Sequence, residues 1–147
     1  MSEFNLIVCP NCEAINRTPL SRMAELPKCG KCKAPLFDGH PIALRSGSFD
    51  RHIRHNTIPV VVDFWAAWCG PCKMMAPLFE KAAMELEPSV RLAKLDTEAE
   101  SSIAAQYNIR SIPTFAIFRG GREIARQAGA MDYAELARWI GTNAFQR

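Results

Sequence analysis

The segment spanning residues 60–73 constrains this chain more than any other, because an apolar run leads directly into two cysteines three positions apart. It reads Val-Val-Val-Asp-Phe-Trp-Ala-Ala-Trp-Cys-Gly-Pro-Cys-Lys. β-Branched residues favour a buried strand, and proline favours the first turn of a helix. The segment therefore predicts a strand, a short loop and a helix, with Cys69 at the helix N-terminus.

Cys69 is the predicted reactive thiol of this pair. Backbone N–H groups without intrahelical partners, together with the helix dipole, favour an anion at a helix N-terminus. The thiolate of Cys69 is therefore stabilised, and Cys72 lies deeper in the same turn. We expect Cys69 to attack a substrate disulfide and Cys72 to resolve the mixed disulfide that forms.

Composition limits the class of protein. The net charge of +3 is spread along the 147 residues, so the charge pattern suggests neither nucleic acid nor a membrane as partner. The apolar run Leu6-Ile7-Val8 is too short for a signal-peptide core, so we expect a soluble, cytoplasmic protein. A reducing cytosol disfavours permanent disulfides, which leaves metal binding and redox catalysis for the six cysteines.

The other four cysteines form two further C-x-x-C pairs, Cys9 with Cys12 and Cys29 with Cys32. Their spacing, C-x2-C-x16-C-x2-C, is typical of two knuckles that each give two thiolates to one tetrahedral zinc ion. We expect one structural zinc ion per chain, and unfolding of this segment without it, because few large apolar residues surround the cysteines. Asn11 and Gly30 are expected to adopt positive φ angles that aim backbone amides at the sulfurs.

Several purposes are open for this zinc site. A folding staple or docking surface is favoured because such sites are closed, with redox sensing as the alternative. A second catalytic dithiol is disfavoured, since neither pair lies between a strand and a helix. A nucleic-acid-binding ribbon is disfavoured because Phe4 and Phe37 are the only aromatic residues in positions 1–40. The three histidines fit no common metal motif and are expected at the surface: His40, His52 and His55.

After a turn-rich link at residues 38–41, periodicity predicts alternating strands and helices. Strands are expected over residues 42–45, 59–65, 90–95, 114–118 and 123–127, the last two forming a hairpin. Helices are expected from residue 48 and over residues 71–87, 100–107 and 133–143, the last capped by Asp132 and Glu135. The chain therefore divides into a zinc ribbon, residues 1–38, and an α/β domain, residues 39–147.

Asp63 is the residue that local rules fail to explain. A carboxylate within Val-Val-Val-Asp-Phe-Trp should be excluded from a strand buried on both faces. Such violations tend to be functional, and burial would raise the pKa of this carboxyl until it exchanges protons near neutral pH. A solvated position at a sheet edge is the alternative.

These residues resemble the active-site signature of the thioredoxin family, from the tryptophan before the first cysteine to the lysine after the second. The resemblance covers residues 41–147, and the matching positions there are Asp63, Pro77, Lys94, Asp96, Ile112, Pro113, Thr114 and Gly129. With its ribbon, the chain is similar to the zinc-containing bacterial thioredoxins of the thioredoxin 2 type. The resemblance implies an α/β thioredoxin fold, a central mixed sheet with helices on both faces, preceded by a small zinc ribbon.

The resemblance also implies roles for individual residues. In thioredoxins, the aspartate matching Asp63 assists deprotonation of the second cysteine, and a buried lysine matching Lys94 interacts with it. An ordinary surface lysine is the alternative for Lys94. A cis-proline at Pro113 would leave the backbone of Ile112 free to pair with substrate. The expected substrate-binding residues are Trp68, Gly70, Pro71, Ile112, Pro113 and Gly129.

The implied function is a protein-disulfide reductase with many client proteins. The chain lacks a dinucleotide-binding motif, so we expect no catalytic cofactor and assign re-reduction to a flavin- and NADPH-dependent thioredoxin reductase. A thiol oxidase or isomerase is the enzyme alternative, although glycine and proline between the cysteines resemble reductases. A docking or chaperone-like protein is the non-enzyme alternative. We expect a monomer.

Overall fold

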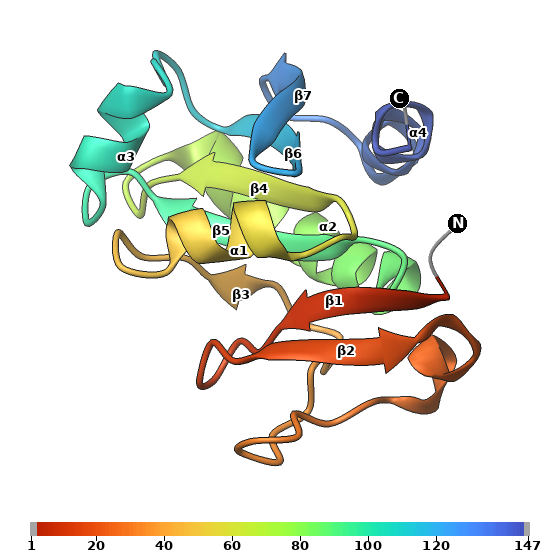
Figure 1. Cartoon of the computed structure of the whole chain (residues 1–147). Coiled ribbons are helices and arrows are strands. Elements are labelled where there is room, and N and C mark those ends of the chain that lie inside the picture. The colour runs from red at the N-terminus through yellow and green to blue at the C-terminus, as the bar shows by residue number, and fades with distance from the viewer. Residues whose placement is uncertain (1–2, 146–147) are drawn as a thin grey trace.

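The computed structural model describes residues 3–145. The chain begins with an antiparallel hairpin of β1 (Phe4–Val8) and β2 (Ile15–Pro19), followed by the short 3-10 helix η1 (Leu20–Glu25). The hairpin carries the first cysteine knuckle, since Cys9 and Cys12 lie in the turn between its strands. The second knuckle follows in an irregular segment, below the rest of the molecule in Figure 1.

A five-stranded sheet in the order β3-β5-β4-β6-β7 forms the centre of the larger domain. Its strands are β3 (Ile42–Ala43), β4 (Val60–Trp65), β5 (Arg91–Asp96), β6 (Thr114–Arg119) and β7 (Arg122–Ala128). β5 runs parallel to β3 and β4, whereas β6 is antiparallel to β4 and β7. The sheet is therefore mixed, and all five predicted strands are confirmed to within two residues at each end.

Helices cover both faces of this sheet (Figure 1). Within residues 3–145 they are α1 (Phe49–His55), α2 (Gly70–Leu86), α3 (Ser101–Gln106) and α4 (Tyr133–Asn143). Side chains of α1 and α3 pack on one face, and those of α2 and α4 on the other. Asp132 and Glu135 form the predicted capping box of α4. No helix in this described stretch has the length and apolar character needed to cross a bilayer.

β4 is the central strand and is buried on both faces. Val60, Val62 and Phe64 pack with α1 and α3, whereas Val61 packs with α2 and α4. Such a strand reads as a continuous apolar run because neither face meets water. It therefore holds the loop that follows it, which ends at Cys69, on a rigid support.

The ribbon shares a core with the domain. Ile7, Leu36 and Phe37 of the ribbon pack with Ile58, which lies just before β4. Cys9 and Cys29 belong to the same buried cluster. The ribbon has too few apolar residues for a large core of its own, and it completes this one with a side chain from the domain.

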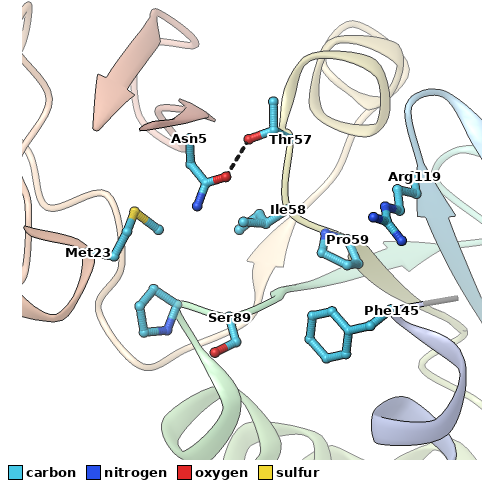
Figure 2. A pocket seen from close by; sticks show the side chains of 9 residues that line it. Asn5, Met23, Thr57, Ile58, Pro59, Ser89, Arg119 and Phe145 are labelled. Carbon is cyan, nitrogen blue, oxygen red and sulfur yellow. Dashed lines mark hydrogen bonds between the residues drawn. The ribbon is translucent and has the colours of Figure 1, made fainter. Parts of the chain in front are cut away.

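Hydrogen bonds join β1 to the segment that leads into β4. The amide of Thr57 donates to the carbonyl oxygen of Leu6 at 3.0 Å, and the amide of Leu6 donates to Oγ1 of Thr57 at 3.0 Å. The Thr57 hydroxyl also donates to Oδ1 of Asn5 at 2.8 Å, as Figure 2 shows beside a cavity of about 400 Å³. The ribbon is thus anchored to the segment that leads into β4.

Arg91 is buried at the junction between ribbon and domain, with 1% of its surface exposed. Its Nη2 donates to the carbonyl oxygen of Leu36 at 2.7 Å, and its guanidinium lies 4.2 Å from the centre of the Phe37 ring. Its Nη1 is 3.6 Å from the carboxylate of Glu87, whose side chain is 3% exposed. Burial raises the pKa of Glu87 to about 7, and the charge of Arg91 acts against that rise.

The expectation that all three histidines lie at the surface is wrong for His52. His40 and His55 are exposed, but His52 is buried on the inner face of α1. It lies three residues after Phe49 and next to Ile53, so it shares their apolar helix face. Burial, with the positive charges of Arg91 and Arg51, lowers the pKa of His52 to about 4, and the ring is neutral at pH 7.

Candidate functional site

Cys69 is the N-cap residue of α2, as the sequence predicted. Its Sγ accepts a hydrogen bond from the backbone amide of Cys72 at 3.2 Å, and Pro71 lies in the first turn. Cys69 and Cys72 are joined by a disulfide with their Cα atoms 5.2 Å apart, and each is 3% exposed. The structure thus describes the oxidised pair, whose first sulfur already faces a backbone N–H.

A groove of about 420 Å³ opens beside Cys69. Its lining residues come from the start of α2, from the loop after β5 and from the loop before β6: Trp68, Cys69, Gly70, Pro71, Thr97, Ile109, Arg110, Ser111 and Ile112. The Sγ atom of Cys69 lies 3.8 Å from the carbonyl oxygen of Ile112. An extended chain paired with the backbone of Ile112 would therefore place its own sulfur close to that of Cys69.

Trp68 stands at the rim of this groove. It is 68% exposed, and its indole Nε1 donates to Oε1 of Glu98 at 2.6 Å. Asp96 holds the loop that carries Glu98 by accepting from the amides of Glu98 and Ala99 at 2.9 and 3.3 Å. Sequence reasoning missed Glu98, because no local pattern relates it to a tryptophan thirty residues away.

Pro113 and Gly129 are not among the lining residues of the groove. The Ile112–Pro113 peptide bond is cis, and Pro113 is buried. Its carbonyl oxygen accepts from the amide of Gly129 at 2.9 Å. Gly129 has a φ of +96°, a conformation that favours glycine. These two residues support the loop whose Ile112 faces the cysteines.

Asp63 is fully buried in β4, and neither carboxylate oxygen has a hydrogen-bond partner within residues 3–145. Burial raises the pKa of Asp63 to about 7, while the charge of Lys94 acts to lower it. Because side chains alternate along a strand, Asp63 shares the face of Val61, which packs beneath α2. The sheet-edge alternative is wrong, since β4 is the central strand.

Lys94 is the partner of Asp63 in the parallel register of β4 and β5. It is half-buried, and its Nζ lies 4.7 Å from the centre of the Trp65 ring. The structure gives the two residues no ion pair within 4 Å across the described residues. Lys94 therefore acts on Asp63 through its charge at longer range. Lys94 is half-buried, so the alternative of an ordinary surface lysine does not describe it.

The four ribbon cysteines converge on one point. Their Sγ atoms all lie within 4.8 Å of one another, with Cys9 and Cys32 at 3.6 Å and Cys12 and Cys29 at 3.6 Å. A tetrahedral zinc ion with Zn–S bonds of about 2.3 Å requires sulfur separations of about 3.8 Å. The donor set and its dimensions fit a structural metal ion of this kind.

The two knuckles repeat one hydrogen-bond pattern. The Sγ of Cys9 accepts from the amides two and three residues later at 3.3 and 3.5 Å. The Sγ of Cys29 does the same at 3.4 and 3.5 Å. Amides that point at a thiolate offset its charge, so each knuckle stabilises the ionised sulfur that a metal requires.

The expected positive φ angles at Asn11 and Gly30 are wrong. Left-handed residues occur instead at Glu13 and Lys33, one residue beyond each knuckle, with φ of 65° and 69°. Each of these residues donates its amide to the carbonyl oxygen of the first cysteine of its knuckle at 2.9 Å. The reversal of the chain therefore falls after the second cysteine of each pair.

Two asparagine side chains complete the ribbon site. Asn16 donates Nδ2 to the Sγ of Cys29 at 3.5 Å and accepts from the amide of Gly30 at 2.8 Å. Asn11 donates Nδ2 to the Sγ of Cys32 at 3.5 Å. The backbone amide of Cys32 and the Asn16 side chain lower the pKa of the Cys29 thiol to about 6. Sequence reasoning missed Asn16 because it lies outside both C-x-x-C pairs.

Comparison with known families agrees with both halves of this description. The thioredoxin family model matches residues 40–142, which is more than half of the chain. The chain belongs to the thioredoxin family. A second family model, described as "Thioredoxin 2, N-terminal", matches residues 8–34, which contain all four ribbon cysteines. The predicted combination of a zinc-ribbon segment and a thioredoxin fold is therefore confirmed.

Individual thioredoxins resemble the chain over different lengths. Thioredoxin C-3 of Corynebacterium nephridii is 44% identical over 135 residues, covering 92% of this chain and 92% of that protein. Thioredoxin 1 of Synechococcus elongatus is 41% identical over 95 residues, covering 65% of this chain and 89% of its own. Among solved structures, a point-mutant thioredoxin from Halobacterium salinarum NRC-1 matches with a TM-score of 0.66 at 27% identity, covering 76% of this chain and 96% of that one.

Thioredoxins are thiol–disulfide oxidoreductases, and this thioredoxin carries the required pair. Cys69 and Cys72 stand at the start of α2, where the first sulfur caps the helix. The groove opens beside that sulfur. The chain is therefore a protein-disulfide reductase in its general class.

Proposed function

We propose that Cys69 and Cys72 reduce client disulfides in two exchange steps. The Cys69 thiolate attacks one client sulfur, which forms a mixed disulfide and releases the other client sulfur as a thiolate that takes up a proton. Cys72 then loses its proton and attacks Cys69, which forms the Cys69–Cys72 disulfide and releases the second client thiolate. Client disulfide and enzyme dithiol are exchanged for client dithiol and enzyme disulfide.

The observation that carries this proposal is the position of Cys69 as the N-cap of α2. Its sulfur accepts the amide of Cys72 at 3.2 Å and stands at the positive end of a 17-residue helix. Both features stabilise the thiolate over the thiol, which lowers the pKa of Cys69 below that of a free cysteine. Trp68, Gly70, Pro71 and Ile112 then form the surface that a client contacts, with Pro113 and Gly129 in support.

Asp63 is the proposed proton acceptor for Cys72. A carboxyl with a pKa of about 7 is partly ionised at neutral pH, so it can take a proton and return it. Its face of β4 packs beneath the helix that holds Cys72. Lys94, beside it in the sheet, keeps that pKa from rising further. These two residues are positioned to assist the second step of the exchange.

Zinc is the proposed metal of the ribbon, one ion per chain. Four thiolates in a closed tetrahedron suit zinc, and they leave no open position for catalysis. The metal therefore serves as a structural staple for the ribbon, taken as residues 1–38, which docks on the thioredoxin domain, taken as residues 39–147. The shared cluster around Ile58 supports this docking role.

Re-reduction is assigned to a thioredoxin reductase, in the cytoplasm, with the protein acting as a monomer on disulfide-containing clients. The test is NADPH-coupled insulin reduction by the full chain with a thioredoxin reductase. The wild type should be active and Cys69→Ser inactive. Faster refolding of scrambled ribonuclease than reduction of insulin would favour an isomerase instead. Activity that survives in the Cys69→Ser/Cys72→Ser double variant would favour a chaperone-like protein.

A further inference from the structure

Arg110 is the only charged side chain among the described residues that line the groove beside Cys69. It is exposed, and it makes no hydrogen bond or ion pair with any residue between positions 3 and 145. A full positive charge without a partner is thus available in the groove where a client disulfide must bind. Because this inference names the clients of that groove, it rests on the proposed function.

The backbone around Arg110 is held in place on its N-terminal side. Arg126 donates Nη2 to the carbonyl oxygen of Tyr107 at 2.7 Å and Nη1 to that of Asn108 at 3.4 Å. Arg126 is itself fixed by Glu123 through two bonds of 2.6 and 2.7 Å. The hydrogen bonds of Arg126 hold the loop in place, whereas the side chain of Arg110 makes none with any described residue.

The C-terminal side of the same loop is fixed as well. The Thr114 hydroxyl donates to the carbonyl oxygen of Ser111 at 2.6 Å, and the amide of Gly129 donates to that of Pro113 at 2.9 Å. On the N-terminal side, Ile109 precedes Arg110, packs on the core and donates its amide to the carbonyl oxygen of Ala104 at 2.9 Å. A fixed backbone lowers the entropy that Arg110 loses when it binds a partner.

Glu98, the acidic residue bonded to the groove rim, does not neutralise Arg110. It accepts the indole N–H of Trp68 at 2.6 Å, on the side of the groove formed by the cysteine loop. Arg110 belongs to the loop that forms the other side. Arg110 is therefore the charge that the lining of the groove presents to a client, and it can orient that client.

We propose that Arg110 selects client segments that carry a carboxylate two residues from the reactive cysteine. A client strand paired with Ile112 extends along the groove by about 3.3 Å per residue, and Arg110 lines the same groove two residues before Ile112, so we assign to Arg110 the client side chain two residues from the cysteine. A guanidinium can bind a carboxylate through two parallel hydrogen bonds. Clients with glutamate or aspartate at that position are bound more tightly than those with lysine.

The test compares three disulfide-linked peptides that differ only at the residue two positions from the cysteine: Glu, Gln or Lys. A second set of peptides places the same three residues on the other side of the cysteine. The set in which charge changes the rate shows in which direction the client chain runs through the groove. The reduced full-length protein should reduce the Glu peptide of one set about two- to five-fold faster than the Gln peptide. Raising the ionic strength to about 0.5 M should shrink that ratio toward one.

Charge variants at Arg110 test whether this residue causes the preference. Arg110→Gln should bring the three rates together, Arg110→Glu should favour the Lys peptide, and Arg110→Lys should keep a weaker preference for Glu. Arg138→Gln, at an exposed arginine of α4 outside the groove, should keep the wild-type preference. An unchanged Glu preference in Arg110→Glu, or equal wild-type rates for all three peptides, would overturn the proposal.

The Gln peptide tests the proposed function separately. If the wild type fails to reduce it, the reductase function itself is refuted, and the selection of clients falls with it. If the Gln peptide is reduced but charge has no effect in either set, only the role of Arg110 is refuted.

Discussion

The thioredoxin domain and the ribbon both contain Cys-x-x-Cys, yet the structure uses the motif in two different ways. In the domain, Cys69 and Cys72 are bonded to each other at the start of α2. In the ribbon, the close sulfur contacts run between knuckles, from Cys9 to Cys32 and from Cys12 to Cys29. The backbone around each pair decides its chemistry. A helix that begins at the first cysteine makes that sulfur nucleophilic, whereas a tight chain reversal presents both sulfurs to a metal.

The two regions also differ in the forces that hold them together. The domain has two large apolar clusters, one on each face of its sheet. The ribbon has one small cluster, which includes two of its own cysteines and borrows Ile58 from the domain. The stability of the ribbon therefore depends on a bound metal and on its contact with the domain. The stability of the domain depends less on either.

The largest expected effect separates the two kinds of cysteine. Cys69→Ser should lower insulin reduction at least about a thousandfold, because the nucleophile is lost, while the zinc content stays at one per chain. Cys12→Ser is the matched change in the ribbon. It should lose zinc and retain reductase activity. Activity with thioredoxin reductase and zinc by atomic absorption are measured on both proteins, and the opposite pattern would contradict the division.

Removing the metal should unfold the ribbon before the domain. Loss of a structural zinc site should lower the free energy of unfolding of the ribbon by about 4 kcal/mol or more. Hydrogen exchange on the wild type with and without a strong chelator locates the change. Amides of β1 and β2 should lose protection while those of β4 keep theirs. Equal loss of protection in both sheets would show that the two regions are one cooperative unit.

Asp63→Asn tests the buried carboxyl of the domain through pH. This carboxyl titrates near 3.8 when unfolded and at about 7 when folded. Between these values the folded protein keeps a proton that the unfolded chain has lost, so the free energy of unfolding falls as pH rises from about 4 to 7 and is level above. The variant should therefore be more stable than wild type by up to about 4 kcal/mol at pH 8 and by little near pH 4.

Urea unfolding at several pH values measures this difference, and insulin reduction should be slower in the same variant. Exposed Asp50, changed to Asn, is the control, with an expected change within about 0.5 kcal/mol at every pH. A stability gain in Asp63→Asn that does not depend on pH would show that its carboxyl is not the group described.

Arg91→Met tests the contact between the two regions. The variant leaves the buried carboxylate of Glu87 without its ion pair and removes the bond to Leu36, so it should lose about 3 kcal/mol of unfolding free energy. The double variant Arg91→Met/Glu87→Gln should recover part of this loss, whereas Arg138→Met should change little. Denaturation in urea gives these values. A loss below about 0.5 kcal/mol would mean that Arg91 does not hold ribbon and domain together.

Sequence patterns predicted the domain better than the ribbon. The strands and helices of the domain follow long periodic runs, and their ends agree to within two residues. The hairpin of β1 and β2 was not predicted, because five-residue strands carry too little periodicity. The positive φ angles were misplaced by two or three residues, since only the hydrogen bonds of the folded knuckle fix them.

For the site, residues that break a local rule could be found from the sequence. The cysteine pairs and Asp63 do so, and the structure places them at the metal cluster, the start of α2 and the central strand. Arg91 gives no such signal, because it is the first residue of a strand that also contains Lys94 and Asp96. Arg110, Glu98 and Asn16 break no local rule, because their surroundings join segments far apart in the chain.

The most direct measurement is the pH dependence of alkylation at each cysteine of the reduced, zinc-bound protein, assigned by mass spectrometry. We predict that Cys69 reacts with iodoacetamide with a midpoint well below the ordinary thiol value of about 8.5, while the four ribbon cysteines stay unmodified at the same pH. A midpoint for Cys69 at or above about 8.5, or equally fast modification of the ribbon cysteines, would contradict the assignment of one pair to catalysis and two pairs to the metal.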